Sequence, residues 1–195
     1  MKVEEEKLGV VKLNLGAGKL PLKGYVNIDI RSVPFIDVVH DIRKMKELYQ
    51  DNSIDEIMAG DVLEHLELTH WKKALNDWVD LLKPGGVLKL RTIDIKKMID
   101  YFNLFTSPEG YDPRENWDKF VHYLYGDQDY LENTHNCGFT EEYLADDLED
   151  MGMRIEKIWH DGGYLLRVTA IKGEEEPLTC LDHNDYPSAG LILTK

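Results

Sequence analysis

The sequence predicts an α/β protein built on a mostly parallel sheet, and three observations support this prediction. Short β-branched runs alternate with segments of helical apolar spacing along most of the 195 residues, a pattern typical of parallel strands joined by helices. The motif "KPGG", Lys83–Gly86, separates one such helix from the strand after it. Near the end, "RIEKIWHDGGYLLRVTAIK" pairs two strand-like runs through Asp161-Gly162-Gly163, which is hairpin chemistry and predicts an antiparallel edge.

Seven strands are therefore expected, five of them before the hairpin. The five are Val11–Leu15, Tyr25–Ile30, Ile36–Ile42, Ser53–Val62 and Val87–Ile95. Helical segments are expected at Arg43–Gln50, Thr69–Leu82 with Thr69 as N-cap, Lys96–Leu104, Trp117–Leu124 and Thr140–Met151 with Thr140 as N-cap. The segment 106–139 is too long and too rich in aromatic residues for an idle loop, so we expect a lid or acceptor-binding segment there.

One connection breaks the alternation. In "VKLNLGAGKLPLKGYVNIDI", ten residues separate Gly18 from Asp29, and one of them is Pro21. A dinucleotide-binding unit places a full helix there and needs about 20 residues to do so. The connection is therefore expected to hold at most a shortened first helix.

Composition restricts the partners and the compartment. The chain carries 37 acidic against 23 basic side chains, a formal net charge of −14, which disfavours nucleic acids and anionic membranes. Cys137 and Cys180 fit neither a disulfide framework nor a metal motif, so no metal site is predicted and a reducing compartment is favoured. Without an apolar leader or a membrane-length run, the sequence predicts one cytoplasmic domain, residues 1–195, with a core at 11–172 and a tail at 173–195.

Three strand ends carry residues suited to a nucleoside-containing ligand. The turn Gly16–Gly18 lets a ligand approach the backbone, and Asp29 can accept both hydroxyls of a ribose. Asp41, at the end of the third strand, can accept from the amino group of a base. Parallel strands present their carboxyl ends along one edge, so these residues are expected to meet in one crevice.

With these residues in order, the sequence resembles the class I S-adenosylmethionine-dependent methyltransferases, specifically the methyltransferase type 11 group. The resemblance covers Val11 to Lys172 and lies in "LNLGAG", "NIDI", "DVVHDIRK", "SIDEIMAGDVLEHL", "LLKPGGVLKLRTID" and "THNCGFTEEYLADDLEDMGM". It implies a Rossmann-like methyltransferase fold with a seven-stranded sheet. It also implies S-adenosylmethionine as cofactor, S-adenosylhomocysteine as product and a small-molecule acceptor.

The resemblance also implies roles for single residues. The cofactor contacts would be Asn14, Gly16, Ala17, Gly18, Asp29, Ile30, Asp41, Ile42, Gly60 and Asp61. Asn14 stands where the family commonly has an acid. Gly60 and Asp61 would lie near the methionine amino group, although Asp61 is equally suited to cap the segment that follows it.

If the acceptor is a hydroxyl, a histidine is the base best matched to neutral pH. His65 in "VLEHL" and His135 in "NTHNCGF" are the candidates for catalysis, and each has a structural alternative as a packing or tethering side chain. The leading hypothesis is a methyltransferase acting on a small molecule such as a saccharide or a metabolite hydroxyl. The alternatives are a non-catalytic S-adenosylmethionine-binding module of the same fold and an NAD-dependent oxidoreductase.

Overall fold

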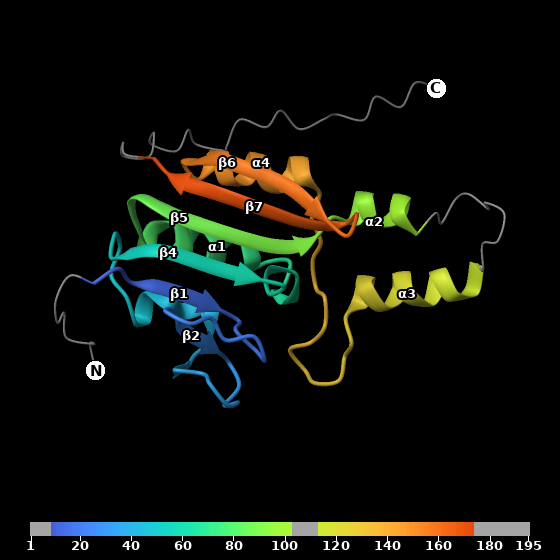
Figure 1. Cartoon of the computed structure of the whole chain (residues 1–195), viewed down its shortest axis with the longest axis horizontal. Helices are drawn as coiled ribbons and strands as arrows, with labels where there is room; N and C mark the ends of the chain where they lie inside the picture. Colours follow the sequence, from blue (N-terminus) through green and yellow to red (C-terminus); the bar gives the residue numbers. More distant parts are fainter. Residues whose placement is uncertain (1–8, 103–112, 174–195) are drawn as a thin grey trace, which may run out of the picture.

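The computed structural model describes residues 9–102 and 113–173 and contains one seven-stranded sheet in the order β3-β2-β1-β4-β5-β7-β6 (Figure 1). The strands are β1 Lys12–Leu15, β2 Val26–Asp29, β3 Val38–Val39, β4 Ile54–Gly60, β5 Leu82–Ile93, β6 Met153–Asp161 and β7 Leu165–Lys172. The pairs from β3 to β5 are parallel, whereas β7 runs antiparallel to both β5 and β6. The predicted mostly parallel sheet with a reversed hairpin strand is confirmed.

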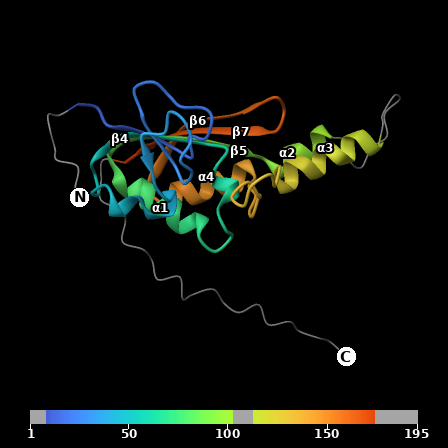
Figure 2. The same cartoon turned by 90° about the horizontal axis from the view of Figure 1, so that it is seen from below.

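The helices are short. The α-helices are α1 Trp71–Leu81, α2 Ile95–Tyr101, α3 Pro113–Tyr125 and α4 Glu141–Asp150, and the 3₁₀ helices are η1 Ile42–Glu47 and η2 Leu63–His65. α1, α4 and η1 lie on one face of the sheet, and α2 and α3 extend beyond the carboxyl ends of the strands (Figure 2). Among the described residues, no helix is long and apolar enough to cross a membrane.

The hydrophobic core lies between the sheet and its helix-covered face. Alternate strand residues such as Leu13, Ile57 and Leu88 are fully buried there against Leu75 and Trp78 of α1, the period-2 pattern of a strand with one buried face. The core also includes Leu144 and Leu148 of α4 and Leu166, Val168 and Ala170 of β7.

The opposite face of the sheet carries polar side chains, and no helix of the described residues covers it (Figure 2). Glu56 of β4 is only 7% exposed on this face and accepts hydrogen bonds from Lys12 at 2.9 Å, Lys89 at 2.5 Å and the Tyr25 hydroxyl. Burial alone would raise the pKa of Glu56, but these donors outweigh burial and lower it to about 2. The buried carboxylate is therefore charged and paired with two lysines.

The connection from β1 to β2 contains turns and no helix, which agrees with the expectation of at most a shortened helix there. Side-chain amides replace the missing helical hydrogen bonds. The Asn14 amide donates to Leu20 O at 3.2 Å and to Asn27 Oδ1 at 2.9 Å. Asn27 Oδ1 also accepts from Leu22 N at 2.7 Å, and the Asn27 amide donates to the carbonyls of Leu22 and Tyr25. We call this buried pair the amide clamp.

Local signals at the ends of later elements are confirmed. Thr140 caps α4, its hydroxyl accepting from Tyr143 N at 3.2 Å, and Asp161-Gly162-Gly163 turns the hairpin with positive φ at both glycines. Thr69 is not the cap of α1. The preceding turn bonds His70 N and Trp71 N to Glu67 O, and His70 occupies the N-cap position without a side-chain cap.

Two other boundaries differ from the expectation. The predicted helix at 43–50 is the 3₁₀ helix η1, which is kinked at Lys44. Lys83–Gly86 lies inside β5, where the pairing with β4 shifts between Ile54 and Glu56, rather than before the strand. Parts of three expectations lie outside the described residues. They are the end of the helix at 103–104, the start of the lid or acceptor segment at 106–112, and the tail from 174.

The network around Glu56 predicts an acid-dependent contribution to stability. Glu56→Gln should lower the free energy of unfolding at pH 7 by about 2 kcal/mol, because the two lysines lose a charged acceptor. Since the folded-state pKa of Glu56 lies at about 2 and its ordinary value is 4.5, the difference between wild type and variant should be full above pH 4.5 and should shrink as pH falls toward 2.

Urea denaturation across this pH range measures the effect. Glu156→Gln, at an exposed position of β6, is the matched control and should leave stability unchanged. A Glu56→Gln variant as stable as the wild type at pH 7 would contradict the stabilising role of the Glu56 carboxylate.

Candidate cofactor site and histidine pair

The turn after β1 is fixed to the end of β2 by two hydrogen bonds. Ala17 N donates to Ile28 O at 3.0 Å, and Gly18 N donates to the Asp29 carboxylate at 2.8 Å. Gly16 and Gly18 both have positive φ, +64° and +51°. A β-carbon on Gly16 would lie 2.3 Å from a Val62 methyl group, so this position requires glycine for space as well as conformation.

Asp29 is buried, with 5% of its surface exposed, and its carboxylate is only partly occupied. It accepts from Gly18 N, from Arg31 N at 2.9 Å and from Arg31 Nε at 3.2 Å. A carboxylate offers about four lone-pair sites, so three donors leave capacity for a further one. The Arg31 guanidinium lies 4.0 Å from the centre of the Tyr130 ring, which brings the segment 126–139 against the end of β2.

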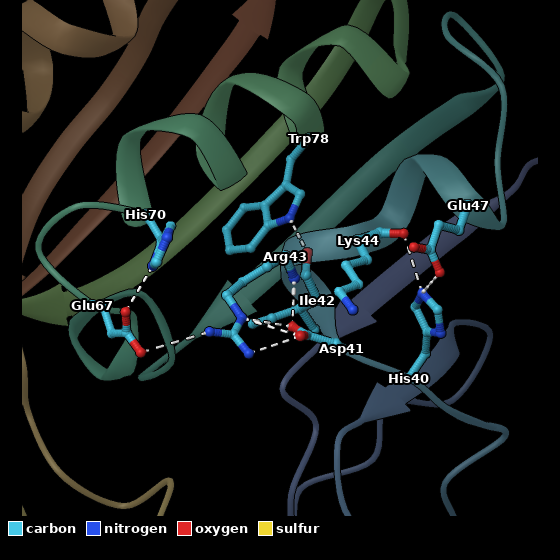
Figure 3. Close-up of polar contacts among 9 residues, drawn as sticks. All are labelled: His40, Asp41, Ile42, Arg43, Lys44, Glu47, Glu67, His70 and Trp78. Carbon is cyan, nitrogen blue, oxygen red and sulfur yellow. Dashed lines mark hydrogen bonds and ion pairs between the residues drawn. The ribbon is translucent and has the colours of Figure 1, made fainter.

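Asp41 ends the loop after β3 and begins η1 (Figure 3). Its carboxylate is held by Arg43 through the backbone N–H at 3.0 Å, Nε at 2.9 Å and Nη2 at 2.8 Å. Burial works against ionisation of Asp41, but the hydrogen bonds and charge of Arg43 lower its pKa. The carboxylate expected to accept from a base is thus occupied by Arg43 in this structure.

The neighbours of Asp41 fix its position in turn. Arg43 also lies 3.9 Å from Glu67, whose carboxylate contacts His70 Nδ1 at 2.8 Å, and the Trp78 indole N–H donates to Ile42 O at 2.8 Å (Figure 3). η1 is therefore attached both to α1 and to the turn before it.

The end of β4 is joined to its neighbours as well. Gly60 is its last residue, and Asp61 follows with a φ of +51°. Asp61 N donates to Arg91 O at 2.8 Å, and Arg91 Nε donates to the Asp61 carboxylate at 2.6 Å. Val62, and not Asp61, stands at the N-cap position of η2, without a side-chain cap. The capping alternative for Asp61 is wrong, since its carboxylate binds Arg91 instead.

His65 and His135 lie side by side, although 70 positions separate them in the sequence. Their ring centres are 4.7 Å apart and their planes nearly perpendicular. Two hydrogen bonds from Asn136 join the two segments: its backbone N–H donates to Glu64 O at 2.8 Å, and its side-chain amide donates to His65 O at 2.9 Å. Burial lowers the pKa of both imidazoles, so both are neutral at pH 7.

Glu64 is a third member of this cluster that sequence reasoning did not assign. It is 3% exposed, and Thr92 Oγ1 donates to its carboxyl at 2.9 Å. Burial raises the pKa of Glu64 to about 8. The signal in the sequence was an acid between apolar residues in "VLEHL", which is ambiguous until the turn is known to bury that position.

Two of the expected residues stand apart from the rest. Asn14 is committed to the amide clamp through its amide, and Ile30 is 42% exposed beyond the end of β2. Gly16–Gly18, Asp29, Asp41, Gly60 and Asp61 follow the carboxyl ends of four adjacent strands, as the sequence predicted. A hollow of about 370 Å³ lies away from these residues, at the amino ends of β1 and β2, and is lined by Gly9–Lys12 and Gly24–Val26.

The sequence and the fold were compared with those of known proteins. The family model described as "Methyltransferase domain" matches residues 19–90. A search of curated proteins finds no match.

Several solved structures share the fold. A S-adenosylmethionine-dependent methyltransferase from Methanosarcina mazei is 17% identical, with a TM-score of 0.57 over 90% of this chain and 100% of that one. One from Mesorhizobium loti is 16% identical, with a TM-score of 0.55 over 84% and 91%. The 1,6-didemethyltoxoflavin-N1-methyltransferase of Burkholderia thailandensis, solved with 1,6-didemethyltoxoflavin and S-adenosylhomocysteine, is 17% identical, with a TM-score of 0.55 over 84% and 71%.

The chain has the Rossmann-like fold of these methyltransferases, and the family model matches the part from residue 19 to residue 90. The match in sequence runs from the turn after β1 to β5, and the match in fold includes the reversed strand β7. Within this fold, the connections after β1 and β2 are short loops in place of helices.

The contact between Gly16 and Val62 predicts a specific pattern of destabilisation. Gly16→Ala should lower the free energy of unfolding by about 3 kcal/mol, because backbone strain and a steric clash add together. Gly24→Ala is the matched control. Its φ is +84°, but nothing lies within 4 Å of the added carbon, so it should cost about 1 kcal/mol.

Val62→Ala in the Gly16→Ala background should restore part of the loss, because it removes the methyl carbon that would lie 2.3 Å from the new β-carbon but keeps the Val62 β-carbon at 2.8 Å. Chemical denaturation of the three variants and the wild type measures these differences. Equal losses in the free energy of unfolding for Gly16→Ala and Gly24→Ala would show that the contact with Val62 does not restrict the residue type at position 16.

Proposed function

We propose that this chain binds S-adenosylmethionine along the carboxyl ends of β1 to β4 and transfers its methyl group to a small-molecule acceptor, such as a saccharide or metabolite hydroxyl. The observation that carries the proposal is the hydrogen bond from Gly18 N to the Asp29 carboxylate. This bond holds the glycine turn beside the buried Asp29 carboxylate. The carboxylate could accept from the ribose of the cofactor, and the methionine part of the cofactor would pass over the turn.

The residues present fit such a cofactor. Asp29 retains capacity for a ribose hydroxyl after its three protein donors, and the Gly16–Gly18 backbone lies open to close approach. Asp41 and Ile42 would frame the adenine, and this requires Arg43 to share or release the Asp41 carboxylate. Gly60 and Asp61 would face the methionine end. No helix begins after Gly18, so the turn offers little dipole to a pyrophosphate, which argues against NAD as the ligand.

The acceptor would enter between η2 and the segment 126–139. When bound, S-adenosylmethionine would supply a methyl group carried on a positively charged sulfur. The methyl carbon would pass to the acceptor oxygen, and the sulfur would be left as a neutral thioether. The chain's contribution is to align the two reactants and exclude water. His65 or His135, neutral at pH 7 and with Nδ1 held by a backbone carbonyl, would accept the proton that the hydroxyl loses.

A cytoplasmic location and the absence of nucleic-acid substrates remain predictions from composition. A net charge of −14 supports the second of these.

Cofactor binding tests the proposal directly. Titration calorimetry with S-adenosylhomocysteine should show one site per chain, and Asp29→Asn should weaken it by about tenfold or more, because a charged acceptor is lost. Asp150→Asn is the matched control, since Asp150 is an exposed residue at the end of α4 and has no place in the cofactor site. Affinity that is the same in both variants and the wild type would refute the assignment of Asp29.

Transfer itself separates an enzyme from a cofactor-binding module. With isotopically labelled S-adenosylmethionine and a broad panel of hydroxyl acceptors, the wild type should release a labelled methylated product. His65→Gln should lower the rate about 10²-fold while leaving the affinity for S-adenosylhomocysteine unchanged. His70→Gln, at an exposed histidine near η1, should retain the full rate. Cofactor binding without any labelled product would favour the non-catalytic module.

A further inference from the structure

The acceptor side of the domain contains a cluster that the methyl-transfer proposal uses only in part. Glu64, His65 and His135 each bring one potential ligand atom to within 4.8 Å of the others. We propose that these three side chains bind one divalent transition-metal ion, with Zn²⁺ or Fe²⁺ as the chemical type. Two imidazoles and one carboxylate are a ligand set that such ions favour.

The histidines are oriented as metal ligands are. His65 Nδ1 lies 3.2 Å from Thr134 O, and His135 Nδ1 lies 2.7 Å from Tyr123 O. A ring N–H that donates to a backbone carbonyl fixes the tautomer and leaves Nε2 with a free lone pair, which is the usual second contact of a metal-bound histidine. Both histidines show this arrangement independently, from different segments of the chain.

The carboxyl group of Glu64 gives a second, independent observation. It is buried, and the side-chain hydrogen bond that it receives in the described part of the chain comes from a neutral donor, Thr92. The nearby Arg91 is held by Asp61 instead. A buried carboxyl with no cation bound to it is costly in the charged form. A metal ion beside Glu64 would supply the missing positive charge.

A small hollow adjoins the cluster. Its volume is about 10 Å³, close to the space of one water molecule, and it is lined by Glu64, His135 and Cys137 with apolar side chains that include Ile93 and Met98. His65 does not line the hollow, so the hollow offers room for a water bound to the ion and not for the ion itself.

Coordination requires a modest contraction. Zinc binds imidazole nitrogen at about 2.0–2.1 Å and carboxylate oxygen at about 2.0–2.2 Å, so ligand atoms now up to 4.8 Å apart must move closer together. The hydrogen bonds of Asn136 hold the two backbone segments in place, which confines this movement to side-chain torsions. Three protein ligands leave a coordination position open, the pattern of a catalytic rather than a structural site.

The metal site stands apart from methyl transfer and needs neither cofactor nor acceptor to be measured. If the chain both binds the ion and transfers methyl groups, the open coordination position of the ion would bind the acceptor oxygen and favour loss of the hydroxyl proton. His65 and His135 would then act as ligands and not as bases. The ion would lower the pKa of the acceptor hydroxyl, and solvent water would take the proton.

The test uses the full chain after treatment with a chelator and dialysis. Titration with Co²⁺ should give visible absorption bands that saturate at one ion per chain and are abolished by Zn²⁺. Glu64→Gln, His65→Gln and His135→Gln should each weaken binding by at least about tenfold. The exposed pair Glu67 and His70, in contact at 2.8 Å, supplies the matched controls, and Glu67→Gln and His70→Gln should bind as the wild type does.

A measurement on the wild type protects the test against variants that fail to fold. In imidazole NMR spectra, diamagnetic Zn²⁺ should shift the signals of His65 and His135 at substoichiometric concentration and leave that of His70 unchanged. No one-to-one binding of Co²⁺ or Zn²⁺, or effects centred on other histidines, would overturn the proposal. Calorimetry with S-adenosylhomocysteine on the metal-free protein reports separately on the proposed function.

Discussion

The amide clamp of Asn14 and Asn27 is the constraint on which the candidate site depends. A chain that passes from β1 to β2 without a helix leaves backbone N–H and C=O groups with no regular partners, and buried groups of this kind must be paired. The two amides satisfy those of Leu20, Leu22 and Tyr25. With the loop fixed in this way, Gly18 can reach Asp29, and the turn lies where the fold positions a ligand.

The same missing helices explain the open face of the sheet. Parallel sheets are normally covered on both faces because each crossover connection lays a helix on one of them. Here the crossovers from β1 and β2 are loops, so the face that their helices would cover carries Lys12, Glu56 and Lys89 instead of apolar side chains. Charge pairing around Glu56 makes this face compatible with water while still restraining three adjacent strands.

Sequence reasoning succeeded where the determining interactions are local. The Thr140 cap and the Asp161-Gly162-Gly163 turn depend on neighbours within a few residues, and both are confirmed. The alternation of elements predicted parallel strands, and their shared direction predicted that the residues after their carboxyl ends would lie along one edge of the sheet. Thr69 was wrong as a cap because Glu67 closes the turn first, a competition between adjacent polar residues that pattern alone cannot rank.

What the sequence could not reveal depends on distant or competing partners. Arg31 and Arg43 take hydrogen-bonding capacity from Asp29 and Asp41, and nothing in their spacing distinguishes them from solvent-exposed arginines. The contact of His65 with His135 joins segments 70 positions apart, so no metal motif was visible in the spacing. Glu64 became notable only when its burial was known.

The place of β7 has a consequence for how the chain reaches this structure. β7 is the last strand described, yet it lies between β5 and β6 and supplies fully buried side chains to the core. Until residues 165–172 have left the ribosome, β5 exposes an unpaired edge, and α4 has only part of its packing surface. The sheet therefore cannot be completed until residues 165–172 have been synthesised, and the exposed edge of β5 is where nascent or truncated chains would associate with one another.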